Sequence, residues 1–451
     1  MGQLPTGEPE WDLHYDEKGT LTAPAQGDFL NQVAASGITD LFVFSHGWGT
    51  SQDHAQALYG AMFPMIRNAA KGVAGLGKLG FAGIYWPSLW FPPTPATSPQ
   101  AAESAQADTG PVVDLSAGTA AVSGAEIAAS LRPGFADPGQ QDTITQIGQL
   151  IDGGQAMAGA TEAAKEQQIL QISRLIRSLL PPAPDGAVED SGETALMQTT
   201  DPKTDYQTAA DVFGSTPAGG AEEGIADWFG SAINGAKDVA RVFSYTVMKT
   251  RAGTIGRTGL GPLLAALHTR QPALRVHLIG HSFGARLVSF ALAGVGQPAD
   301  SPVASLLLLQ GAFSHWSFAH AQDSPFGEAG ALNTFGDRVH GPKVATFTVY
   351  DWAVGVWYPK ASFLSGQDTE AVVGDRWGGM GADGFQAVSP AEDRAMPAQG
   401  GLAYGFTPGT YYRVDAAKVI DNTAGEPFSG AHSDIQKSQV AQLAVAAATP
   451  S

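Results

Sequence analysis

"LRVHLIGHSFGARLVSF", residues 274–290, is the segment of this chain whose pattern gives the clearest indication of its fold. Its first half, Arg275 to Ile279, is a short apolar run that predicts a buried strand. The next five residues, Gly280-His281-Ser282-Phe283-Gly284, fit the pattern G-x-S-x-G, and the small and apolar residues after them predict a helix. A serine on such a strand-to-helix turn is either a nucleophile or only a turn residue. Other residues of the sequence are needed to distinguish these two roles.

The composition excludes several classes of function. The 451 residues include 43 Asp and Glu against 25 Lys and Arg, which gives a net charge of -18 and argues against binding to nucleic acid or to an anionic membrane surface. There is no cysteine, so disulfides, thiolate catalysis and cysteine-bound metals are excluded. The first residues lack the features of a secretory signal, and no long apolar run predicts a transmembrane segment. We therefore expect a cytoplasmic protein.

Strands and helices alternate along two parts of the chain, which predicts an α/β fold with a parallel sheet. The expected strands are 38–45, 79–86, 275–279, 304–312, 343–351 and 411–416, and the expected helices are 53–70, 223–249, 259–270 and 433–448.

Residues 91–222 interrupt this alternation. They begin with a stretch rich in Pro, Ala, Ser and Thr, which does not build a core. Later segments such as 166–180 carry apolar residues at helical spacing. We expect a core made of residues 1–90 and 223–451, with 91–222 as a partly helical, partly flexible insertion that is a candidate lid.

A serine nucleophile needs a base, and the base needs a carboxylate that orients it. Four histidines follow Ser282, and His432 alone lies beyond Asp351, which follows the strand "VATFTVY". His432 precedes the terminal helix, so the chain order Ser282, Asp351, His432 is that of an α/β-hydrolase triad. Asp337 and Asp375 are alternative acids.

Acyl transfer also requires N–H donors for the negative oxygen of the tetrahedral intermediate. One candidate is the amide of Phe283, the residue after the serine. The other lies in the glycine-rich "FSHGWGTS" (44–51), where we expect the amide of Trp48, with Gly47 as the alternative. In this loop we expect His46 to shape the backbone rather than to transfer protons.

These motifs together resemble the α/β-hydrolase superfamily, in particular its serine esterase and lipase branch. The matching residues are "SHGWG" (45–49), "GHSFG" (280–284), Asp351 and "AHSD" (431–434), and the resemblance covers roughly 35–90 and 240–450. It implies an α/β-hydrolase fold, an eight-stranded, mostly parallel central sheet flanked by helices. It also implies hydrolysis through an acyl-enzyme, without a cofactor or metal.

The expected function is hydrolysis of carboxylic esters of a small-molecule or lipid-like kind. The same triad serves amide, urethane and thioester hydrolases, so these remain alternatives within the enzymes. A non-catalytic binding protein of the same fold is the alternative from a different class. The sequence has no H-E-x-x-H, no P-loop motif and no strand-linked G-x-G-x-x-G with a later acid. We expect the glycines of "GGMGADG" (378–384) at a loop or helix edge rather than around a phosphate, and the oligomeric state stays open.

Overall fold

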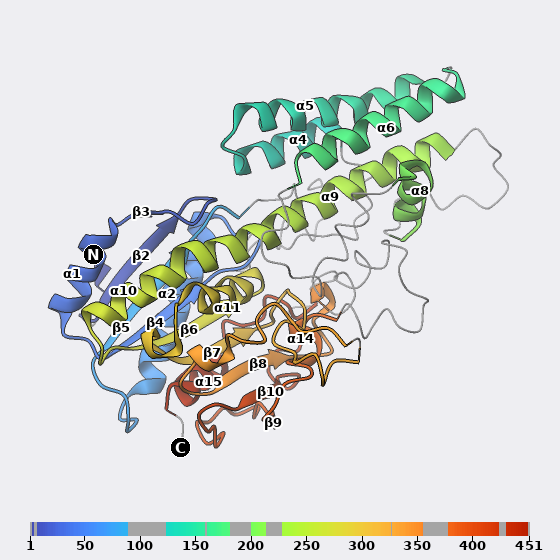
Figure 1. Cartoon of the computed structure of the whole chain (residues 1–451). Coiled ribbons are helices and arrows are strands. Elements are labelled where there is room, and N and C mark those ends of the chain that lie inside the picture. The colour runs from blue at the N-terminus through green and yellow to red at the C-terminus, as the bar shows by residue number, and fades with distance from the viewer. Residues whose placement is uncertain are drawn as a thin grey trace.

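A central sheet of ten strands organises the computed structural model of this chain, which describes residues 2–3, 7–88, 123–157, 160–180, 200–212, 228–325, 327–354, 378–423 and 430–449 (Figure 1). The strands are β1 Gly2–Gln3, β2 Pro9–Tyr15, β3 Leu21–Ala23, β4 Asp40–Ser45, β5 Leu79–Tyr85, β6 Arg275–His281, β7 Val303–Leu309, β8 Lys343–Phe347, β9 Ala391–Ala395 and β10 Tyr411–Asp415. Their order is β1-β2-β5-β4-β6-β7-β8-β10-β9, with β3 paired to β2. Only the pairs of β2 with β1 and with β3 are antiparallel.

The strand order reverses direction next to β4. From β4 the chain passes through α2 to β5 on one side, whereas β6, β7 and β8 follow one another on the other side. Both β4 and β5 are buried along their whole length, as expected for strands with helices on both faces. In open α/β sheets the crevice at the carboxyl ends of strands beside such a reversal is the usual ligand site. Here the reversal falls between β4 and β6, so their carboxyl ends are the expected position for a site.

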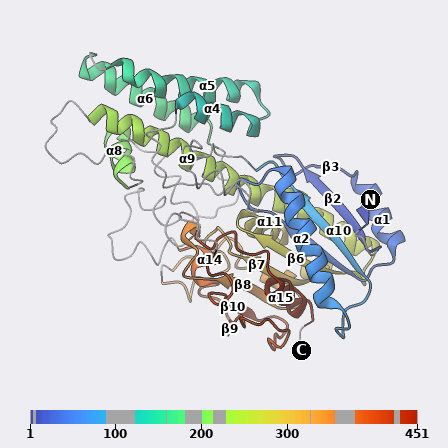
Figure 2. The same ribbon diagram turned by 180° about the vertical axis from the view of Figure 1, so that it is seen from behind.

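Helices cover both faces of the sheet (Figures 1 and 2). Along β4, Leu41 and Val43 belong to one buried cluster and Phe42 and Phe44 to the other. The helices with side chains in the first cluster include α1, α9, α10 and α11, and those in the second are α2 and α15. Their bounds are α1 Gln26–Ser36, α2 Gln52–Ala70, α9 Trp228–Ile255, α10 Gly261–Arg270, α11 Phe283–Gly294 and α15 Ser438–Ala448, and a π-helical turn, Gly256–Leu260, joins α9 to α10.

Several helices lie away from the sheet beside the N-terminal part of α9 (Figures 1 and 2). They are α4 Gly124–Leu131, α5 Pro138–Gly153, α6 Glu162–Ser178 and α8 Pro202–Val212. Their buried residues, such as Ile147 and Ile172, belong to the same apolar cluster as α9. The partly helical content expected for 91–222 is therefore present, while the division into core and lid stays a prediction.

The prediction of a mostly parallel α/β sheet with flanking helices is confirmed, but the sheet has ten strands rather than eight. The strand predicted for 343–351 ends at Phe347, because the chain turns there toward a bridge between Asp351 and Gly430. β2 was not expected from the sequence, although its alternation of buried Trp11, Leu13 and Tyr15 with more exposed residues is a strand signal. Nor were α1, β3, β9 and the short α14 Met380–Asp383.

Candidate active site

Ser282 sits in a strained backbone conformation between β6 and α11. Its φ of 57° and ψ of -123° are unusual for a residue with a side chain, and such conformations cost about 1–3 kcal/mol. The surrounding structure holds this conformation, since Ser282 N–H donates to the carbonyl of Leu309 (3.1 Å) and its own carbonyl accepts from Ala285 and Ala312. The expected strand, serine turn and helix are thus present in the structure.

Two glycines allow neighbouring backbones to approach this turn. A Cβ atom on Gly284 would lie 2.2 Å from the carbonyl oxygen of Ser45, at the end of β4. A Cβ on Gly47 would lie 2.6 Å from the Cβ of Ser282. Only glycine fits at either position without displacing the chain. The loop after β4 therefore lies directly against Ser282.

Ser282, His432 and Asp351 form a continuous hydrogen-bonded row. The Oγ of Ser282 is 2.9 Å from Nε2 of His432, and Nδ1 of His432 is 2.9 and 3.1 Å from the two carboxylate oxygens of Asp351. Because a carboxylate only accepts, Nδ1 carries the proton and Nε2 is free to accept from the serine hydroxyl. The structure thus brings together the three residues expected from the chain order, and their catalytic roles stay a prediction.

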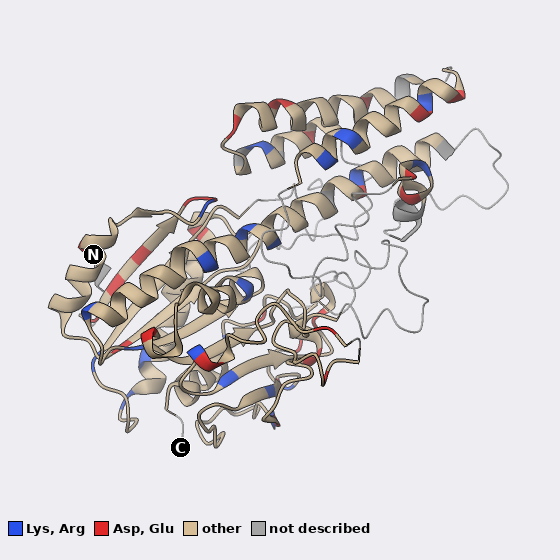
Figure 3. Cartoon of the chain, viewed as in Figure 1, with Lys and Arg blue, Asp and Glu red and all other residues tan. Residues whose placement is uncertain are grey.

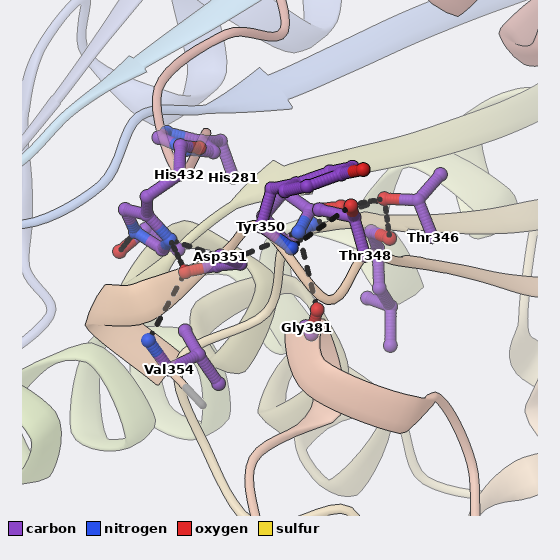
Figure 4. Close-up of polar contacts among 11 residues, drawn as sticks. His281, Thr346, Thr348, Tyr350, Asp351, Val354, Gly381 and His432 are labelled. Carbon is purple, nitrogen blue, oxygen red and sulfur yellow. Dashed lines mark hydrogen bonds and ion pairs between the residues drawn. The ribbon is translucent and has the colours of Figure 1, made fainter. Parts of the chain in front are cut away.

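The carboxylate of Asp351 is fixed by further donors (Figure 4). It is buried, and it accepts a hydrogen bond from Gln310 Nε2 (2.9 Å) and another from the amide of Val354 (3.0 Å). The Gln310 amide makes two further hydrogen bonds. Its Nε2 also donates to the carbonyl of Gly381, and its Oε1 accepts from the hydroxyl of Thr346. This arrangement holds the Asp351 carboxylate in a fixed position beside His432.

The loop after β4 carries the proposed oxyanion donors. His46 is buried, and burial lowers its pKa to about 4. Its Nδ1–H donates to the carbonyl of Gly47 (2.8 Å) while its own carbonyl accepts from the indole N–H of Trp86 (3.1 Å). These bonds shape the loop, which is the role expected for His46. Phe283 is the first residue of α11, so its N–H has no partner within the helix.

A second Ser-His-Asp row lies at the opposite ends of the same strands. Ser305 Oγ is 2.9 Å from Nδ1 of His277, whose Nε2 is 3.1 Å from Asp40. All three side chains are buried, and Asp40 begins β4 whereas Ser45 ends it. Ser305 has neither the strained turn nor the helix N-terminus of Ser282. A row of these residue types is therefore insufficient to define a site, and Ser305 offers an internal control.

The alternative acids and histidines lie elsewhere or outside the described residues. Asp337 is exposed and pairs with Arg338, and Asp375 falls among the residues that the structure does not describe. His315 pairs with Asp383 (2.7 Å), and Nε2 of His340 contacts the carbonyl of Ser301. Gln310 was not among the residues expected from the sequence. Its position at the end of β7, beside the site, was the only available signal.

No concentration of basic residues marks the part of the chain that the structure describes, where blue residues are scattered over many elements (Figure 3). Within the described residues no group of three or more His, Asp or Glu side chains is arranged to hold a metal ion. No helix among them is long and apolar enough to cross a membrane. In comparisons with known proteins, no family model, no curated protein and no solved structure matches this chain.

Proposed function

We propose that this chain is a serine hydrolase of the α/β-hydrolase fold that cleaves carboxylic esters through an acyl-enzyme. One observation carries the proposal: Ser282 on its strained turn is bonded to His432, which is bonded in turn to the buried Asp351. A serine hydroxyl becomes a nucleophile when such a base is within hydrogen-bond reach, about 2.6–3.2 Å. The row at Ser305 lacks the strained turn, so the proposal rests on Ser282 alone.

The proposed reaction begins with attack of Ser282 Oγ on the ester carbonyl while Nε2 of His432 takes the hydroxyl proton. The tetrahedral intermediate collapses when His432 returns that proton to the departing alkoxide, which leaves as an alcohol. A water molecule then attacks the acyl-enzyme, again giving its proton to His432, and Ser282 recovers its proton as the acid leaves. Asp351 keeps the imidazole in the required tautomer and stabilises its positive charge.

The amides of Phe283 and Trp48 are the proposed oxyanion donors, with Gly47 N–H as the alternative. Support comes from the contact between the Gly47 loop and Ser282 and from the position of Phe283 at the start of α11. A helix N-terminus favours negative charge at this point. Removing one such donor in enzymes of this kind costs about 10²–10³-fold in turnover.

The test is hydrolysis of p-nitrophenyl esters of increasing acyl length by wild type, Ser282→Ala and Ser305→Ala. We expect turnover by the wild type and by Ser305→Ala, and loss of at least about 10³-fold in Ser282→Ala. Equal activity in Ser282→Ala and wild type would refute the assignment. Amide, urethane and thioester analogues of the best ester would then establish which bond is preferred. Folded protein that turns over none of them would favour the binding-protein alternative.

A further inference from the structure

His281 lies inside the G-x-S-x-G motif, but the proposed reaction does not use it. Its side chain is buried, and its Nε2 is 2.9 Å from the backbone carbonyl oxygen of His432. The two imidazole rings are 5.0 Å apart (Figure 4). A residue beside the nucleophile therefore contacts the backbone of the residue that activates it.

The chemistry of this contact fixes the protonation of His281. A carbonyl oxygen only accepts, so Nε2 carries the proton. Burial is the main cause that lowers the pKa of His281 to about 3; the nearby His432 and His46 rings lower it further, and the bond to the His432 carbonyl offsets this only in part. His281 therefore remains a neutral donor at ordinary pH, and it does not compete with His432 for the serine proton.

The residues on either side of His432 are held by bonds of their own. Ala431 N–H donates to the carbonyl of Tyr350, which pins the residue before it. On the other side, the carbonyl of Ala431 accepts from the amide of Asp434 (3.0 Å), and the Asp434 carboxylate accepts from Lys437 Nζ. The bond from His281 differs from these because it acts at the backbone of His432 itself, whereas Asp351 bonds the imidazole side chain.

We infer that His281 is a positioning residue, which holds the backbone of His432 so that its Nε2 stays within hydrogen-bond distance of Ser282. The expected effect of His281 on turnover rests on the proposed function, whereas its expected effect on the position of His432 does not. Misplacement of a catalytic group by about 1 Å costs up to about 10²-fold in rate, so the bond has a measurable consequence.

The test compares His281→Asn with His281→Gln. The amide nitrogen of Gln reaches the position of imidazole Nε2, whereas that of Asn reaches only the position of Nδ1. We expect kcat for the best ester to fall about tenfold or more in His281→Asn with KM little changed, and to recover in His281→Gln. Equal kcat in wild type and His281→Asn would overturn the inference, and so would equal losses in both variants.

A matched control and a readout without substrate complete the experiment. His340 makes the same kind of bond, from Nε2 to the carbonyl of Ser301 (2.9 Å), at the far ends of the strands, and His340→Asn should leave kcat unchanged. The imidazole Nδ1 proton shared by His432 and Asp351 should give a downfield proton NMR signal. The signal should weaken in His281→Asn and return in His281→Gln even if no ester is hydrolysed. An unchanged signal in His281→Asn would overturn the inference, whereas inactive wild type with the expected signals would count only against the proposed function.

Discussion

The position of Asp351 depends on a side chain from another strand end. Gln310 has a φ of 46°, is fully buried, and bonds Asp351, Thr346 and Gly381 at once. Chain order and element type were enough to select Ser282, Asp351 and His432 from the sequence. They were not enough to select Gln310 or the bond made by His281, because both depend on which strand ends are neighbours in the sheet.

Gln310→Leu removes the neutral donor to Asp351 while keeping a side chain of similar size. We expect kcat to fall about tenfold or more with little change in KM, because the loss acts through His432 in the transition state. Unfolding free energy should fall by about 1–3 kcal/mol, since a buried carboxylate and a carbonyl lose a partner. Steady-state kinetics and urea unfolding measure both effects. Unchanged kcat in a destabilised variant would mean that Gln310 matters only for folding.

Stability should decrease on acidification because of buried neutral histidines. Burial lowers the pKa of His281 in the folded chain to about 3 from its ordinary value of 6.5, so between these pH values the unfolded chain binds more protons. Folding free energy is therefore lost as the pH falls through this window, by up to about 1.4 kcal/mol per unit and per histidine. The His281→Gln variant lacks this titration. Between about pH 7.5 and 5 we therefore expect wild type to lose about 2 kcal/mol more unfolding free energy than His281→Gln does. Urea unfolding at both pH values measures the difference, and parallel losses in the two proteins would contradict the expectation.

At the scale of elements, most of the sheet could be predicted because its strands are apolar runs next to turn residues. β4, β5, β6 and β7 are buried almost throughout, and each was expected within a few residues of its bounds. β9, in contrast, has the sequence AEDRA with mostly exposed side chains, and only its pairing with β10 makes it a strand. Edge strands of this kind carry no apolar pattern that sequence reasoning can detect.

The contact between β4 and the start of α11 requires glycine at 284. In Gly284→Ala the new methyl group meets the carbonyl oxygens of Ser45 (2.2 Å) and His46 (2.4 Å), and backbone atoms have little freedom to move away. We expect a loss of about 1–3 kcal/mol in unfolding free energy. Turnover should also fall, because α11 carries Phe283. Gly60→Ala in α2, where a Cβ meets nothing within 4 Å, is the control and should be at least as stable as wild type. Equal stability of the two variants would argue against this close packing.

At the scale of the whole molecule, one buried arginine joins three distant parts of the chain. Arg251 on α9 donates to the carbonyls of Pro87 (2.7 Å) and Gly134 (2.6 Å) and lies 3.4 Å from Glu17. Burial lowers its pKa to about 10. This side chain therefore links the end of β5, the chain after α4 and the turn after β2. Sequence patterns gave no sign of this link, since its partners are backbone atoms far apart along the chain.

Arg251→Met should destabilise the protein by about 2–4 kcal/mol, because two carbonyl oxygens lose a charged donor. The control is Lys203→Met, which removes an exposed ion pair with Glu166 and should cost less than about 1 kcal/mol. Urea unfolding of the two variants measures the difference. If both variants unfold at the same urea concentration as wild type, the bonds of Arg251 do not contribute to the free energy of unfolding.

Activation of Ser282 as a nucleophile is tested by labelling the protein with a fluorophosphonate probe and mapping the labelled peptide by mass spectrometry, in wild type and His432→Ala. We predict covalent labelling of wild type at Ser282 and none at Ser305, with labelling lost in folded His432→Ala. A folded wild-type protein that remains unlabelled, or a His432→Ala variant that labels as fast as wild type, would contradict the claim.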